Sequence, residues 1–229
     1  MGTLVFVAAE AREFDGFSRH VLAVRELRWP LRFCRGAIMN GREVVLLANG
    51  PGPALAVAAA KEAKNRLEKV DAFVSTGYCG ALDSNLGRTA IVVASEVNGN
   101  RSDKPDAPAV FTAGPITSQD RVACTIEEKS NLRESGAIAV EMEAAGVCRV
   151  ALDAGVPFYC VRVVTDTASD VLPLDFNRMR GADGRFSTAK ILGAAALRPL
   201  RVAPALVRLQ RTTKSASIAL GDFIANCRF

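Results

Sequence analysis

The chain of 229 residues is 49% hydrophobic and 23% charged. This composition is typical of a globular protein and argues against a largely disordered chain. No apolar run approaches the roughly 20 residues that a membrane-spanning helix needs. The apolar run at 3–9 lacks the basic flank of a signal peptide. We therefore predict a cytoplasmic protein built as one domain.

The six cysteines are widely spaced, and His20 is the single histidine of the sequence. This pattern favours reduced thiols and argues against a metal site. With so little histidine, acid–base chemistry must depend mainly on Asp, Glu, Lys, Tyr or Cys side chains. The sequence thus argues against a Ser-His-Asp hydrolase.

The net charge of +5 lies entirely in the C-terminal segment. Residues 191–229 contain six Lys or Arg residues and one acidic residue, Asp222, whereas residues 1–190 contain 23 basic and 23 acidic residues. This distribution argues against a general nucleic-acid-binding surface. The distribution is still compatible with an anionic partner that binds the C-terminal segment.

Short apolar runs alternate with helical patterns along the chain. Several runs are apolar on both faces, which is typical of strands in a sheet covered by helices on both sides. The sequence therefore predicts an α/β fold with three αβα layers and a mixed central sheet. The expected strands are 4–9, 44–48, 72–76, 90–94, 137–140 and 158–164, and the expected helices are 53–68, 142–154 and 188–197. A hairpin is expected to turn at 40–41, and 98–108 is expected to be a mobile loop that can cover a site.

Ligands of open α/β sheets bind beyond the carboxyl ends of the strands, which directs attention to the strand ends. Gly50 and Gly52 could belong to a dinucleotide fingerprint, but a tight turn before a helix that starts at Pro53 explains them better. The segment 76–82 suits a structural turn and an anion-binding loop equally well.

Three carboxylates follow apolar strands: Glu141, Glu143 and Asp166. Each has a structural explanation, as a partner of a helix dipole or as a cap. Together, in a chain with one histidine, they suit cleavage of a glycosidic bond through a cationic sugar transition state.

Three segments resemble the superfamily of purine nucleoside phosphorylases and methylthioadenosine/S-adenosylhomocysteine nucleosidases. They are Thr-Gly-Tyr-Cys-Gly-Ala-Leu at 76–82, Ala-Val-Glu-Met-Glu-Ala-Ala at 139–145 and Val-Pro-Phe-Tyr-Cys-Val-Arg-Val-Val-Thr-Asp at 156–166. The resemblance implies a nucleoside phosphorylase-like fold, an enzyme that needs no cofactor, and a homo-oligomer. A looser resemblance, at 171–177, 184–185 and the basic tail, is to the hopanoid-associated phosphorylase branch.

The resemblance implies roles for individual side chains. Asp166 would hold or donate a proton at N7 of the purine, and Glu143 would bind the ribose hydroxyls. Met142 would line the apolar face of the sugar. Glu13 would orient the attacking water in a hydrolytic enzyme.

Further substrate-binding positions are expected at Glu141 and along the 76–82 motif, at Gly77, Tyr78, Cys79 and Gly80. Arg12 is a candidate phosphate ligand. Tyr78 replaces a small residue or serine of many relatives. The segment 117–122 has no aromatic residue for base stacking, so the stacking residue is unassigned.

The leading hypothesis is an enzyme that cleaves the N-glycosidic bond of a purine nucleoside, by phosphorolysis with inorganic phosphate as co-substrate or by hydrolysis. A lipid-linked adenosyl substrate such as adenosylhopane is favoured over methylthioadenosine or S-adenosylhomocysteine, because small soluble substrates need no basic appendage. A catalytically silent nucleoside- or lipid-binding module is the alternative from another class. A third hypothesis, an NAD-dependent oxidoreductase, is supported by Gly50 and Gly52 alone.

Residues 1–200 are expected to form the catalytic domain, and 201–229 a basic amphipathic helix of the same domain. The helix could rest on the inner membrane and bring the active site to a lipid-borne nucleoside. The alternative, in which the apolar stripe of the helix packs on the core, is slightly favoured over membrane contact. That stripe comprises Leu206, Leu209, Leu220, Phe223 and Ile224.

Overall fold

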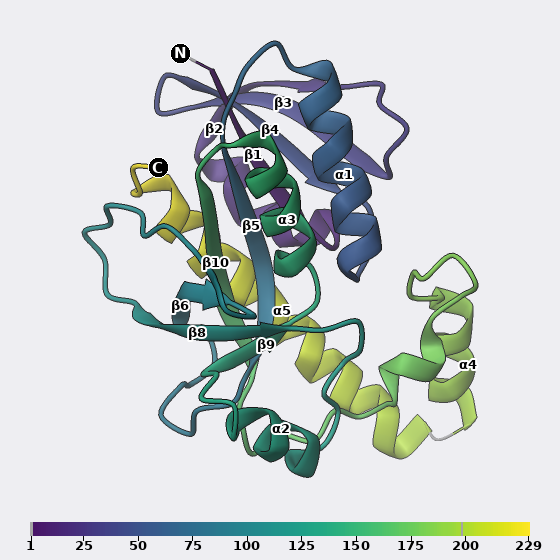
Figure 1. Cartoon of the computed structure of the whole chain (residues 1–229). Helices are drawn as coiled ribbons and strands as arrows, with labels where there is room; N and C mark the ends of the chain where they lie inside the picture. The colour runs from purple at the N-terminus through teal and green to yellow at the C-terminus, as the bar shows by residue number, and fades with distance from the viewer. Residues whose placement is uncertain (1, 198) are drawn as a thin grey trace.

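A ten-stranded mixed sheet forms the centre of the molecule (Figure 1). The computed structural model describes residues 2–197 and 199–229. The strands are β1 (Thr3–Ala8), β2 (Val21–Glu26), β3 (Phe33–Met39), β4 (Arg42–Ala48), β5 (Val70–Ala81), β6 (Ile91–Val97), β7 (Asn100–Arg101), β8 (Thr112–Ser118), β9 (Ala139–Glu141) and β10 (Phe158–Asp166). β1 is parallel to β4 and β5, and β3 is antiparallel to β2 and β4. The predicted mixed α/β class is confirmed.

The long strand β5 joins two parts of the sheet. Its first half pairs with β1 on one edge, β10 pairs with it from Phe73 to Gly80, and its end extends beyond β1 to pair with β9. Because β10 also pairs with β6, β6 with β8 and β8 with β9, these five strands close into a ring. The ring brings the ends of β5, β9 and β10 together.

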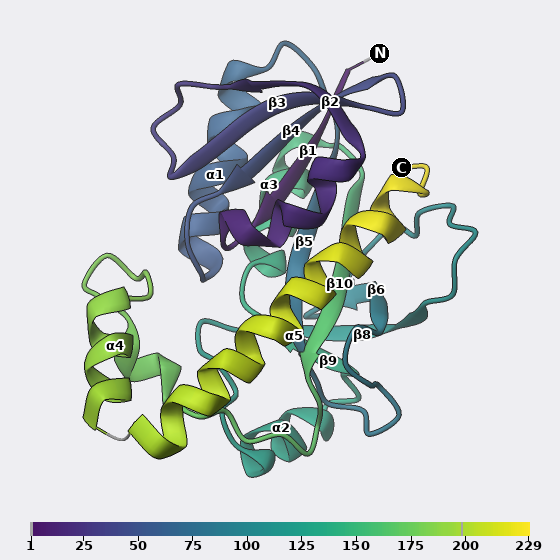
Figure 2. The same cartoon turned by 180° about the vertical axis from the view of Figure 1, so that it is seen from behind.

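Helices cover both faces of the sheet (Figures 1 and 2). α1 (Pro53–Arg66) and α3 (Ala144–Ala154) lie on one face, and the 3-10 helix η1 (Ala11–Arg19) and α5 (Pro199–Ala225) lie on the other. The buried face of α1 consists of four alanines, which lets it approach α3 closely. A Cβ atom on Gly146 of α3 would lie 2.4 Å from the carbonyl oxygen of Pro53.

The second half of α5 belongs to the core. Leu220, Phe223 and Ile224 are buried, whereas Leu206 and Leu209 are half-buried. This part of the helix lies against η1 without room for side chains. A Cβ atom on Gly221 would lie 2.3 Å from the carbonyl carbon of Gly16. The packed alternative therefore holds for the C-terminal half of the predicted stripe.

The beginning of α5 and the helix α4 (Thr188–Leu197) project from the rest of the molecule (Figure 2). Leu192, Leu197 and Leu200 on this projection are 63%, 85% and 92% exposed. None of the described helices is long and apolar enough to cross a membrane.

The elements that sequence analysis missed include β2, β8, η1 and α2 (Ile126–Arg133). β2 is almost wholly exposed and α2 buries one residue, Lys129, so neither has an apolar pattern. The predicted hairpin turn is confirmed, with positive φ angles of 52° at Asn40 and 76° at Gly41.

Two loop predictions are wrong. The segment 76–82 continues β5 as far as Ala81 and is not a turn. The segment 98–108 starts with a β6–β7 hairpin and is held by bridges from Asp103 to Tyr159 and from Asp106 to Arg228. No residue of 98–108, a fully described segment, borders the main cavity, so it does not cover a site.

All six cysteines lie in the described part of the chain, and each is buried and unpaired. Burial raises the pKa of every one of these thiols, to about 12 for Cys34, Cys160 and Cys227. Within the described residues these thiols form no disulfide.

Candidate active site

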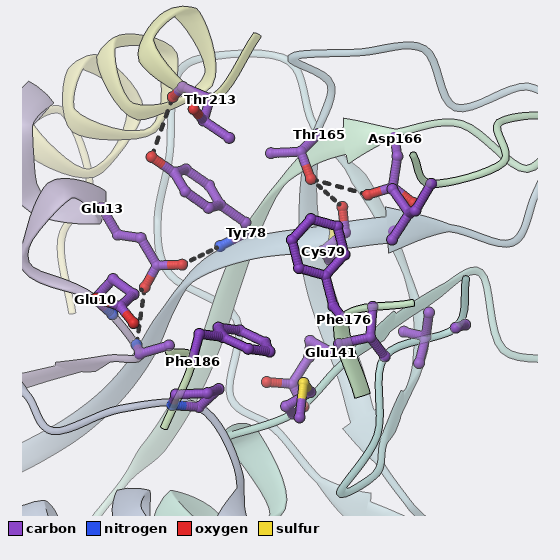
Figure 3. A pocket seen from close by; sticks show the side chains of 18 of the residues that line it. Glu10, Glu13, Tyr78, Cys79, Glu141, Thr165, Asp166, Phe176, Phe186 and Thr213 are labelled. Carbon is purple, nitrogen blue, oxygen red and sulfur yellow. Dashed lines mark hydrogen bonds between the residues drawn. The ribbon is translucent and has the colours of Figure 1, made fainter. Parts of the chain in front are cut away.

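A cavity of about 220 Å³ lies where the carboxyl ends of β1, β5 and β10 meet α5 and the segment after β10 (Figure 3). Its lining is mainly apolar with a few acidic groups, as is common for small-molecule sites. Nine of the ten predicted site residues border it: Arg12, Glu13, Tyr78, Cys79, Gly80, Glu141, Met142, Glu143 and Asp166. The tenth, Gly77, lies directly behind Glu13.

Glu13 stands in the first turn of η1 and is only 4% exposed. Its Oε2 accepts hydrogen bonds from the backbone N–H groups of Ala9 (2.8 Å) and Glu10 (3.1 Å). Its Oε1 accepts one from the N–H of Tyr78 at 3.3 Å (Figure 3). Burial raises the pKa of Glu13, although these backbone groups and Arg162 oppose the rise. The carboxylate therefore occupies the convergent N–H groups that an anion would need.

Gly77 makes this arrangement possible. Its φ of +131° favours glycine, and a Cβ atom there would lie 2.9 Å from the Glu13 carboxyl carbon and 3.0 Å from Nη1 of Arg162. The glycine inside β5 thus leaves space for side chains of the site.

Arg162 is a fully buried cation that organises the acidic groups. Its guanidinium donates to Glu141, to Oγ of Ser75 (2.6 Å) and to the carbonyl oxygen of Thr76 (2.8 Å). Nη1 lies 3.6 Å from Oε2 of Glu143. The arginine therefore offsets part of the repulsion between the two glutamates.

Glu143 precedes α3 and accepts a hydrogen bond at Oε1 from the N–H of Gly52 at 3.0 Å. Burial and the neighbouring Glu141 raise the pKa of Glu143 to about 8, against the opposing effect of Arg162. The Gly50–Gly52 turn leads into α1 at Pro53, as predicted, and its last N–H serves this carboxyl. Two glutamates in one buried site can meet a positive charge on a sugar.

Asp166 ends β10 on the other side of the cavity. Its Oδ1 accepts a hydrogen bond from Oγ1 of Thr165 at 3.0 Å (Figure 3). Its Oδ2 lies 2.6 Å from Nζ of Lys129, a buried residue that sequence analysis missed. Gly80 gives this carboxylate room, since a Cβ atom there would lie 2.9 Å from Oδ2.

The aromatic side chains of the cavity come from the segment after β10. Phe176 of η2 (Phe176–Met179) and Phe186 line it, with their ring centroids 5.9 Å apart (Figure 3). At the end of the segment 117–122, which has no aromatic residue, Val122 and the following Ala123 line the wall of the cavity. No regular sequence pattern surrounds either phenylalanine, so their place in the cavity could not be predicted.

Tyr78 connects the cavity to α5. Its Oη donates a hydrogen bond to the carbonyl oxygen of Thr213 at 3.1 Å (Figure 3). Burial and the nearby Glu13 carboxylate raise the pKa of Tyr78, so the phenol stays protonated. Tyr78 therefore forms a wall of the cavity and does not act as a base.

Among the described residues no cluster of His, Cys, Asp or Glu side chains could hold a metal ion. Arg12 is exposed at the edge of the cavity, and Arg121 is paired with Glu128. The site is thus a pocket of an αβα fold, in which buried carboxylates face an apolar interior. A site of this class suits glycosidic bond cleavage.

Comparison with known proteins agrees with this class. The family model described as the phosphorylase superfamily matches residues 3–115 and 104–192. The chain belongs to the phosphorylase superfamily. It is 26% identical over 172 residues to the 5′-methylthioadenosine/S-adenosylhomocysteine nucleosidase of Staphylococcus aureus (strain JH9), an alignment that covers 61% of this chain and 75% of the relative.

Solved structures show the same fold. The methylthioadenosine/S-adenosylhomocysteine nucleosidase of Neisseria meningitidis, in complex with methylthio-immucillin-A, superimposes with a TM-score of 0.74 at 17% identity, over 99% of this chain and 98% of that one. The futalosine hydrolase of Helicobacter pylori strain 26695 gives a TM-score of 0.70 at 16% identity, over 98% and 96%. The predicted family and activity, cleavage of the N-glycosidic bond of a purine nucleoside, are confirmed.

Proposed function

We propose that the protein hydrolyses the N-glycosidic bond of an adenine nucleoside that has a substituent at its 5′ carbon. The position of Glu13 is the observation that supports water over phosphate as the nucleophile. Its carboxylate already uses the N–H groups of Ala9, Glu10 and Tyr78, and it lies in one buried site with Glu141 and Glu143. A phosphate dianion there would meet three carboxyl groups and would lose the backbone donors.

In this reaction Glu13 accepts a proton from water, and the hydroxide adds to C1′ of the ribose. Burial raises the pKa of Glu13, which makes its carboxylate a stronger base than that of an exposed glutamate. Glu143 binds the ribose hydroxyls and, in its ionised form, stabilises the positive charge that develops on the sugar. Met142, which borders the cavity, packs on the apolar face of the ring.

The bond from C1′ to N9 breaks as its electron pair moves into the purine. Asp166, which is paired with Lys129 in the free protein, takes up a proton from water when the purine binds and passes it to N7, so the base departs neutral. Phe176 and Phe186 provide the aromatic surface for the base that 117–122 lacks. The nucleosidase of Staphylococcus aureus acts, by its name, on two adenine nucleosides with 5′ thioether groups, which supports this substrate class.

Product analysis tests the proposal. Methylthioadenosine and adenosine are incubated with the protein with and without inorganic phosphate, and the sugar product is identified. We expect adenine and the free sugar at the same rate in both buffers. A sugar 1-phosphate, formed only with phosphate present, would contradict hydrolysis.

A lipid-borne adenine nucleoside, such as the predicted adenosylhopane, is the second candidate substrate. The observation in its favour is the projecting hairpin of α4 and the start of α5, where leucines are exposed next to the cavity. Ile191 of α4 and Leu209 of α5 line the cavity itself. We propose that this hairpin contacts an anionic membrane, which would place the cavity beside lipid.

A further inference from the structure

Lys129 is the least expected charged group near the site. It lies on α2, its side chain is 1% exposed, and it does not border the main cavity. Its ammonium donates to Oδ2 of Asp166 at 2.6 Å and to the carbonyl oxygens of Thr167 (2.7 Å) and Asp170 (3.2 Å). All three N–H bonds of the ammonium are therefore used on the side of Asp166 that faces away from the cavity.

The fold holds this ammonium in place. The helix α2 begins with a capping box, in which Thr125 accepts from the N–H of Glu128 and Glu128 accepts from the N–H of Thr125. On the other side, Asp170 accepts hydrogen bonds from the N–H and the hydroxyl of Thr167 and forms a bidentate pair with Arg88. The turn 167–170 thus forms a closed polar shell around Nζ.

A buried ion pair is weak evidence for stability, because desolvation of both charges offsets their attraction. An apolar side chain in the place of Lys129 could fill the same space, so the ammonium calls for a functional reason. That reason lies in its partner, the only carboxylate on this side of the described cavity.

We propose that Lys129 is a positioning residue that acts through Asp166 on the departing purine. This inference rests on the proposed function. When Asp166 gives its proton to N7, the carboxylate that remains lies against the ammonium, which stabilises the new negative charge. The same contact fixes the carboxyl group, together with Thr165, in one orientation toward the base.

The inference predicts that Lys129 matters only when the leaving group needs a proton. Adenine is such a leaving group, whereas 4-nitrophenolate departs as a stable anion. We therefore expect Lys129→Met to lower kcat on methylthioadenosine by at least about tenfold. On 4-nitrophenyl β-D-ribofuranoside the loss should be under about threefold. Glu143→Gln is the matched control, since a defect at the sugar slows both substrates.

Two further variants separate an effect of Lys129 on catalysis from a failure of Lys129→Met to fold. Lys129→Arg keeps a cation beside Asp166 and should recover most of the activity. In the Asp166→Asn background, Lys129→Met should cause no additional loss on methylthioadenosine, because a residue that acts through Asp166 has nothing left to support. The double variant also leaves no unpaired buried charge, so it should fold.

Each outcome decides the matter. Equal losses on the two ribosides, or an additive loss in the double variant, would show that Lys129 is merely structural. Full activity of Lys129→Met on methylthioadenosine would also overturn the inference. If the unmodified protein releases neither adenine from methylthioadenosine nor 4-nitrophenolate from the nitrophenyl riboside, the proposed function is wrong, and the role of Lys129 is rejected with it.

Discussion

The acidic side chains of the cavity are controlled by two buried cations. Arg162 contacts Glu141 and Glu143 on one side, and Lys129 contacts Asp166 on the other. Each cation is fixed by backbone carbonyl oxygens as well as by carboxylates. Substitution of an acidic residue therefore changes two properties together, the chemistry at the site and the balance of buried charge.

Asp166→Asn tests this coupling. The amide keeps the shape of the side chain but has no titratable proton, so turnover of a purine nucleoside should fall by at least about tenfold. It also leaves Lys129 buried without a counter-charge, which should lower the free energy of unfolding by roughly 3–5 kcal/mol. Steady-state kinetics and urea denaturation measure the two effects. In the double variant Asp166→Asn with Lys129→Met, stability should return and activity should not. A return of both would contradict the prediction.

Glu143 makes stability depend on pH. Its pKa is about 8 in the folded protein, above the usual value of 4.5 for an exposed glutamate. Between these two values the folded state binds more protons than the unfolded state, so stability falls as pH rises. The decline should reach at most about 1.4 kcal/mol per pH unit and should end above the folded pKa.

Denaturation of the unmodified protein and of Glu143→Gln over pH 5–9 measures this effect. The variant cannot ionise at this position and should show a shallower decline. Glu13, whose pKa is also raised by burial, accounts for the part of the slope that remains. Identical slopes in the two proteins would exclude Glu143 as the source.

At the scale of elements, the contact between η1 and α5 fixes the position of Glu13. Oγ of Ser217 accepts a hydrogen bond from the N–H of Gly16 (2.9 Å) and donates one to the carbonyl oxygen of Glu13 (3.3 Å). The C-terminal helix therefore supports the wall of the cavity that carries Glu13.

Gly221→Ala should destabilise the protein by about 1–3 kcal/mol, because the new methyl group would overlap the backbone of Gly16. Displacement of η1 should also slow hydrolysis. Gly193→Ala is the matched control, since it lies in α4 with no atom within 4 Å of its Cβ position, and it should be neutral or slightly stabilising. Thermal unfolding compares the two variants, and equal melting temperatures would disprove the tight contact.

Sequence patterns located most elements that have an apolar face. The helix at 188–197 has the predicted bounds, and the predicted strands all lie in or beside observed ones. The 76–82 motif was misread because two glycines in a strand resemble a turn. Gly77 and Gly80 are required there by the carboxylates of Glu13 and Asp166, a tertiary cause that local sequence does not contain.

The site was predicted to a similar extent. Carboxylates at strand ends could be found from the sequence, because the strands before them are apolar. Arg162 interrupts the apolar run 158–164 and could have been noticed as a buried charge. Lys129 lies in a polar helix and looks like a solvated residue, and only the folded chain brings it to Asp166.

At the scale of the whole molecule, the two halves of α5 have different surroundings. The second half packs on the core, whereas the first half and α4 leave leucines exposed. The sequence has no acidic residue between Asp183 and Asp222, and that interval contains seven Lys or Arg residues. An apolar and basic projection of this kind suits an anionic membrane.

Sedimentation with vesicles tests this surface. The unmodified protein should bind anionic vesicles and not neutral ones, and salt should release it. Leu197→Ser with Leu200→Ser should weaken binding by more than about tenfold, because burial of one leucine contributes roughly 1.5–3 kcal/mol. Val110→Ser is the matched control, an equally exposed apolar residue (96%) on a distant loop. Equal binding by all three proteins, or none by the unmodified one, would exclude the membrane contact.

The six buried thiols have a practical consequence. A thiol reagent such as Ellman's reagent attacks the thiolate, and in the folded protein every thiol is both covered and protonated. Cys79 lies at the cavity, Cys160 within β10 and Cys227 at the end of the chain, so the six sulfurs sample most of the molecule. The rate at which each one becomes labelled therefore reports how often its own region opens, without any added probe.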